Sequence, residues 1–137
     1  KHVFTSSGHP VSAAAALKNI EIIEEENLVA NAAKVGAYFK NKLTELKDSQ
    51  PLIGDVRGLG LLLAVELVSD PVTRKGFPKE FRIGDRLNEK FRQDGLIFRA
   101  GNEILNFGPP LCITEPEVDE IVEALERALK ELNLEWA

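Results

Sequence analysis

Apolar residues recur along most of this chain at the spacing of helices. In residues 28–47, in residues 79–94 and after Thr114 they stand three or four apart, which places them on one face of an amphipathic helix. Thr114 and Glu117 have the spacing of a capping box, so the last helix is expected to begin there. The apolar positions are Leu28, Ala32, Val35, Phe39, Leu43 and Leu46 in the first helix, Ile83, Leu87 and Phe91 in the second, and Val118, Ile121, Val122, Leu125, Leu129 and Leu132 in the third.

Residues 11–26 form another predicted helix, but their apolar residues are not confined to one side. Pro10 suits the first turn of a helix, and residues 13–17 are strong helix formers followed by Ile20, Ile22 and Ile23. This run of small and apolar residues predicts close packing on more than one side, until the acidic residues 24–26 end it in solvent. Residues 1–9 are polar, rich in Ser and Gly, and read as an irregular arm.

Two other stretches have the patterns of strands. Residues 61–68 are nearly all apolar, as in a strand buried on both faces, and Glu66 is expected to be a structural acid there. Residues 96–99 and 104–107 flank a Gly-Asn corner at 101–102, which predicts a hairpin that ends at Pro109-Pro110. The order of elements predicts an α+β fold, with helices on one face of a small, mostly antiparallel sheet.

Composition narrows the function classes. The chain has 137 residues, enough for one domain, and a net charge of −5 argues against nucleic acid or an anionic membrane as partner. No apolar run approaches the roughly 20 residues of a membrane span. A single cysteine, Cys112, fits a reducing compartment such as the cytoplasm, and its apolar neighbours predict a buried, inert thiol. Because the chain contains no methionine, we expect it to be a fragment or processed product of something longer.

Residue chemistry alone gives candidate binding groups but no complete catalytic set. His2 and His9 have no suitably spaced metal-binding partners, so no metal site is expected. Arg99 would stand on the predicted hairpin, where a planar guanidinium suits a carboxylate; the alternative is an ordinary surface arginine in a weak ion pair. Residues 5–8, Thr-Ser-Ser-Gly, lead into a helix and could hold a phosphate, although a plain surface loop fits equally well. Gly58 and Gly60 lack the third glycine of a dinucleotide fingerprint and precede a strand.

Three phrases together resemble class III pyridoxal-phosphate aminotransferases. They are TSSGHPVSAAAALKNIEII at the start, DVRGLGLLLAVEL in the middle and GLIFRAGNEILNFGPPLCIT near the end. The resemblance runs from about Thr5 to Leu132, in the family's order and spacing. The KNIEII phrase is reminiscent of the taurine–pyruvate and β-alanine–pyruvate branch of ω-aminotransferases.

The resemblance implies a fold-type I enzyme whose large domain, with the cofactor and the catalytic lysine, is absent from this chain. Residues 1–10 would be a cofactor-loop arm and linker, and residues 11–137 the small C-terminal domain. Thr5 would reach the pyridoxal-phosphate phosphate of the neighbouring subunit in a homodimer, and Arg99 would pair with the substrate carboxylate. The implied reaction moves an amino group from an amine or ω-amino acid to a 2-keto acid such as pyruvate.

The chain also departs from the family pattern. Ser6 stands where many members have an aromatic residue, and Lys18, Lys34 and Lys90 lie at predicted helix surfaces outside the Schiff-base motif. The chain alone is therefore expected to have no catalytic residue and no activity. An aminomutase or lyase of the same family, or a non-catalytic α+β binding module, are the alternatives.

Overall fold

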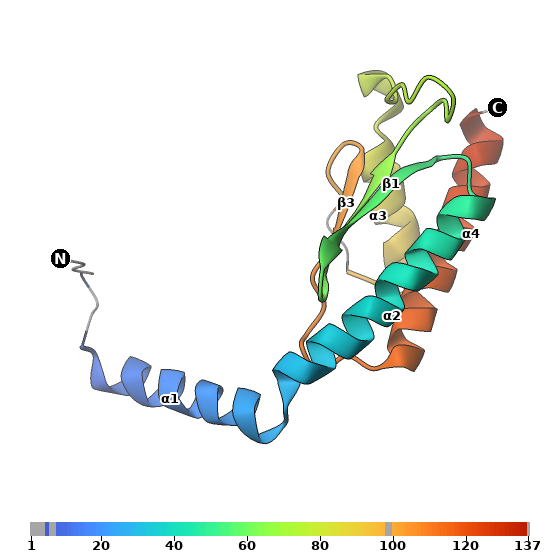
Figure 1. Cartoon of the computed structure of the whole chain (residues 1–137). Helices are drawn as coiled ribbons and strands as arrows, with labels where there is room; N and C mark the ends of the chain where they lie inside the picture. The colour runs from blue at the N-terminus through green and yellow to red at the C-terminus, as the bar shows by residue number, and fades with distance from the viewer. Residues whose placement is uncertain (1–4, 6–7, 98–99, 137) are drawn as a thin grey trace.

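The computed structural model describes residue 5, residues 8–97 and residues 100–136. These form four α-helices, one short 3-10 helix and three strands (Figure 1). In chain order they are α1 (Pro10–Glu25), α2 (Leu28–Ser49), β1 (Ile53–Leu59), β2 (Leu62–Leu67), η1 (Lys79–Phe81), α3 (Ile83–Gln93), β3 (Ile104–Phe107) and α4 (Glu115–Trp136). This arrangement confirms the predicted α+β class.

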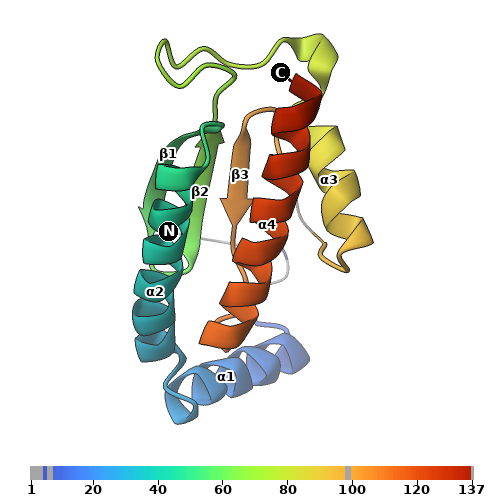
Figure 2. The same cartoon turned by 90° about the vertical axis from the view of Figure 1, so that its right-hand side faces the viewer.

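The strands form an antiparallel sheet in the order β1-β2-β3, with α2 and α4 side by side over one face (Figure 2). Along β2 the buried residues Leu63 and Val65 alternate with Leu62, which is 73% exposed, and with half-buried Ala64. Phe39 of α2 meets Phe107 of β3 edge to face, with ring centroids 5.1 Å apart. The sheet therefore has one covered face, and the prediction of a strand buried on both faces was wrong.

The strand β1 was not predicted. Its outer face carries Asp55 and Arg57, so it lacks the apolar run that marks its neighbour. Gly58 lies near the end of β1 and Gly60 lies in the tight turn into β2. Their φ angles of 136° and 55° are positive, and residues other than glycine rarely adopt such conformations. An added Cβ on Gly36 of α2 would collide with the backbone of Gly60. The glycines thus let a helix backbone and a hairpin turn meet directly.

The C-terminal helix begins and ends with specific contacts. The backbone N–H and the hydroxyl of Thr114 both donate to the Glu117 carboxylate, at 2.8 and 2.7 Å, as the capping-box spacing predicted. At the other end, the indole N–H of Trp136 donates to the Ser69 carbonyl at 3.2 Å, and its ring packs 5.1 Å from Phe77. The helix α4 therefore holds the loop after β2 against the core.

Three further expectations need correction. The helix after residue 79 begins only at Ile83, because Arg82 takes a left-handed conformation at φ 51° and separates η1 from α3. Cys112 is exposed: it lies between Leu111, itself 40% exposed, and buried Ile113, so its apolar neighbours do not enclose it. The close packing predicted for residues 11–26 is not found within the described structure, because α1 projects from the rest of the chain (Figure 1) and has no buried residue there.

None of the helices in the described part of the chain has the combination of length and apolar character that crossing a membrane requires.

Candidate functional site

The turn at residues 100–102 lies next to the predicted substrate arginine. Ala100 forms an isolated antiparallel bridge with Leu105, and the Gly101 N–H donates to the Ile104 carbonyl at 3.0 Å. The predicted corner therefore exists. Of the strand predicted at residues 96–99, the described residues Leu96 and Ile97 have no strand conformation, and Arg99 itself lies outside the described residues.

The helix α3 supports this turn through two residues. The side-chain amide of Asn88 accepts from the Ala100 N–H at 3.0 Å and donates to the Ala100 carbonyl at 3.4 Å. Gly84, one helical turn earlier, lies so close to the turn that an added Cβ would collide with the Gly101 carbonyl. The amide satisfies both backbone groups of Ala100, as a paired strand would, and so fixes the peptide that follows Arg99.

Sequence reasoning missed Asn88. Its only local signal is a polar side chain next to Leu87, on the half-buried flank of an amphipathic helix. Its partner lies twelve residues further along the chain. Because no periodic pattern relates a helix residue to a turn across such a distance, the pairing is visible only in three dimensions.

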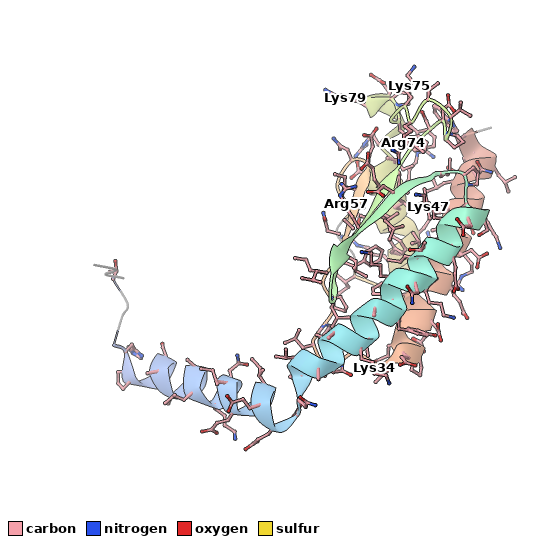
Figure 3. All side chains as sticks on the ribbon, viewed as in Figure 1. Lys34, Lys47, Arg57, Arg74, Lys75 and Lys79 are labelled. Atoms are coloured by element: carbon pink, nitrogen blue, oxygen red, sulfur yellow. The ribbon has the colours of Figure 1, made fainter. Side chains whose placement is uncertain are left out.

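The uncovered face of the sheet carries a compact ion cluster. The Arg57 guanidinium lies 2.6 Å from the Glu66 carboxylate and 3.0 Å from that of Asp55, on neighbouring strands; Figure 3 shows Arg57 on β1. The hydrogen bond from Arg57 lowers the pKa of Asp55, and the bond to Glu66 followed by that to Asp55 raises the pKa of Arg57. Through its pair with Glu66, Arg57 joins β1 to β2, in agreement with the structural role expected for Glu66.

The predicted phosphate loop is described only at Thr5 and Gly8. Both are exposed, and they precede the start of α1, at the end of this helix away from the sheet (Figure 1). His9 caps α1, since its Nδ1 accepts from the Ser12 N–H at 3.4 Å. The chain thus presents a threonine hydroxyl near a helix N-terminus, which suits a phosphate, and the described residues do not bring Thr5 close to the turn at Ala100.

The described residues supply only part of what a pyridoxal-phosphate site requires. Thr5 brings one hydroxyl, which can donate a hydrogen bond to a phosphate, but one hydroxyl does not enclose a cofactor. A Schiff-base lysine needs a neutral amine, whereas Lys18, Lys34 (labelled in Figure 3) and Lys90 form ion pairs with Glu21, Glu115 and Glu131 at 3.0, 3.0 and 2.6 Å. For Lys90 the bond to Glu131 raises the pKa and so favours the charged form. Among the residues that the structure describes, no three potential ligands cluster to hold a metal ion.

The fold and the site define a small α+β domain with one supported turn and one hydroxyl-bearing arm. The sequence pattern of the family described as aminotransferase class-III matches residues 1–129, and the chain belongs to this family. The family depends on pyridoxal phosphate.

Individual relatives agree with this assignment. The chain is 44% identical over 131 residues to an uncharacterised aminotransferase of Sinorhizobium fredii, covering 94% of this chain and 28% of that protein. A solved transaminase with L-alanine superposes with a TM-score of 0.91 at 44% identity, over 99% of this chain and 32% of the other. The ω-transaminase of Pseudomonas jessenii in complex with PMP superposes with a TM-score of 0.87 at 41% identity, over 98% and 29%. The chain thus spans less than a third of the length of these proteins.

Proposed function

We propose that this chain is the C-terminal domain of a pyridoxal-phosphate aminotransferase that moves an amino group from an amine or ω-amino acid to a 2-keto acid such as pyruvate. The observation that carries the proposal is the family match over residues 1–129, which includes all three motif segments. Residues 1–10 serve as the cofactor arm and residues 11–137 as the small domain. A large domain supplies the cofactor and the catalytic lysine, so the chain alone is inactive.

The full-length enzyme is a cytoplasmic homodimer in this proposal. Thr5 of one subunit binds the phosphate of the cofactor that the neighbouring subunit holds. Bound pyridoxal phosphate supplies the chemistry by carrying the amino group between donor and acceptor. The arm of this chain contributes a hydrogen-bond donor to an anionic group, next to the N-terminus of α1. The exposure of Thr5 supports this role.

Arg99 binds the substrate carboxylate in the proposed enzyme, and Asn88 positions it. A guanidinium recognises a carboxylate with two parallel hydrogen bonds, so small displacements of the arginine weaken binding. The two hydrogen bonds between Asn88 and Ala100, one in each direction, and the close contact of Gly84 with Gly101 support a fixed peptide directly after Arg99. Asn88 therefore acts on substrate affinity without touching substrate.

The visible absorbance spectrum of the full-length protein tests this function. We expect a visible cofactor band that bleaches on addition of an amine donor and returns on addition of pyruvate. A protein that shows no band after incubation with pyridoxal phosphate would refute the proposal. A band that bleaches with donor but never returns with any keto acid would favour an aminomutase or a lyase.

A further inference from the structure

The last turn of α4 contacts the segment that precedes α3 through three aromatic rings. The Trp136 ring meets Phe77 and Phe81 edge to face, with centroids 5.1 Å away in both pairs, and these two rings stack on each other at 5.4 Å. The Trp136 indole N–H also donates to the Ser69 carbonyl at 3.2 Å. Aromatic pairs of this geometry stabilise a contact beyond the apolar area that they bury. The end of α4 therefore holds the loop after β2 and η1 together (Figure 2).

Arg86 and Lys90 attach α3 to the same end of α4. The Arg86 guanidinium lies 4.6 Å from the centre of the Phe81 ring, its Nε donates to the Phe81 carbonyl at 2.8 Å, and it pairs with the Glu135 carboxylate at 2.7 Å. Lys90, one helical turn later, pairs with Glu131 at 2.6 Å and with Glu135 at 3.2 Å. The aromatic and ionic contacts at the end of α4 form what we call the C-terminal cluster, which consists of Phe77, Phe81, Arg86, Glu135 and Trp136.

The opposite side of α3 contacts the turn at residues 100–102. Successive helix residues are about 100° apart, so Arg86 and Lys90 lie nearly opposite Gly84 and Asn88. Gly84 and Asn88 are the two residues of α3 that contact the turn, through the close approach to its backbone and through the amide hydrogen bonds. The helix α3 is thus held between the end of α4 and the turn. A displacement of α3 from α4 would therefore also displace the support of the turn.

The C-terminal cluster also lies close to the far end of the turn. Gly76, the residue before Phe77, is so near the Glu103 carboxylate that an added Cβ would collide with it. Phe77 and Asn102 line the same cavity, which has a volume of about 160 Å³. The segment that Trp136 holds is therefore in contact with the residue that follows the turn, and α3 is in contact with the turn itself.

We infer that the C-terminal cluster fixes the turn that follows Arg99, and that Trp136 thereby controls the affinity for the substrate carboxylate. A guanidinium binds a carboxylate through two parallel hydrogen bonds, so a mobile peptide next to the arginine weakens binding. Trp136 is a positioning residue, because it acts through α3 and the amide of Asn88. The effect on affinity rests on the function proposed for Arg99, whereas the effect on the turn does not.

Hydrogen–deuterium exchange of the full-length protein tests the ordering of the turn. The N–H groups of Ala100 and Gly101 are both hydrogen-bonded, each at 3.0 Å, so their exchange rates report local opening of the turn. We expect Trp136→Ala to accelerate the exchange of these two amides by at least about 10-fold, because the support from α3 is loosened. Exchange at the rate of the parent protein would overturn the inference.

Two further variants separate positioning of the turn from a general loss of stability. Val118 is also fully buried in α4 but lies about 27 Å from Trp136 along the helix. Val118→Ala should lower the melting temperature and leave the exchange of the turn amides unchanged. Glu135→Gln removes a charge that pairs with α3 and leaves the core intact, so it should accelerate the turn amides by about 3-fold. Acceleration by Val118→Ala as large as that by Trp136→Ala, or none by Glu135→Gln, would contradict the inference.

Steady-state kinetics of the full-length enzyme tests the consequence for substrate binding. Trp136→Ala should raise KM for a keto acid by roughly 3-fold and leave kcat for a simple amine unchanged. Trp136→Phe keeps a ring against Phe77 and Phe81, so it should recover most of the affinity. A parent protein that transfers no amino group refutes the proposed function and leaves the exchange experiment valid. An active parent whose KM values for keto acid and amine respond equally to Trp136→Ala, or do not respond, refutes the control of affinity by Trp136.

Discussion

Gly36→Ala should destabilise this chain, although alanine is the better helix former. An alanine inside a helix is more favourable than glycine by about 1 kcal/mol. The added Cβ would, however, collide with the backbone of Gly60, which sits in a tight turn at φ 55° and has no side chain to rotate away. Overpacking costs about 1–3 kcal/mol, and rigid backbone partners favour the upper end. We therefore expect a net loss of about 2 kcal/mol and a melting temperature lower by roughly 5–10 °C.

Urea unfolding provides the measurement, followed by far-ultraviolet circular dichroism and by fluorescence of Trp136, the only tryptophan. Two controls separate the terms. Ala37→Gly, at the next and exposed position of α2, should lose about 1 kcal/mol through helix propensity alone. Gly108→Ala, where an added Cβ meets nothing within 4 Å, should be neutral. If Gly36→Ala raises the stability, the helix and the turn are not in direct contact.

Three other predictions concern the ion cluster and the proposed site. Arg57→Ala removes the hydrogen bond that lowers the pKa of Asp55. A carboxyl whose pKa is lowered by folding stabilises the folded state at a pH above its unfolded pKa, and this stabilisation is lost as the carboxyl becomes protonated in acid. In urea titrations the variant should therefore be less stable than the parent at about pH 7 and should approach the stability of the parent at about pH 3. In the full-length enzyme Asn88→Ala should raise KM for a keto acid by roughly 5-fold without changing kcat for a simple amine. Asn88→Asp keeps an oxygen that accepts from the Ala100 N–H, so this variant should restore part of the affinity for the keto acid. Arg99→Ala should raise KM for keto acids far more than for simple amines, and equal effects on both would remove its assigned role.

Periodic patterns predicted α2 and α4 well because each of these two helices buries one continuous stripe. The stripe of α2 predicted from Val35, Phe39 and Leu43 is buried as expected, and so is that of α4. The sheet was harder, since its outer face is uncovered. Arg57 pairs with Asp55 on its own strand and with Glu66 on β2, so β1 has no apolar signature although it lies in the same sheet as β2.

The candidate site depends on relations that no local pattern records. Residue chemistry offered Thr5 and Arg99 as candidates, but only the resemblance to a family gave them specific roles, because their neighbours alone do not separate them from ordinary surface residues. Asn88 meets Ala100 because α3 folds back onto the turn, which requires Gly84 to have no side chain. Cys112 illustrates the opposite error, because apolar neighbours in sequence did not imply burial in space.

The mismatch between the sequence of α1 and its surroundings explains why the chain has a stable core and yet no complete site. The buried apolar side chains of the described structure lie between Val35 and Leu132, whereas α1 has no buried residue there. A binding side chain keeps the position that its ligand requires only when packing and hydrogen bonds with surrounding residues fix it. Within the described chain, α3 holds the turn at Ala100 through Asn88. Substrate and cofactor recognition in such an enzyme therefore depend on the packing between its parts as much as on the residues that touch the ligand.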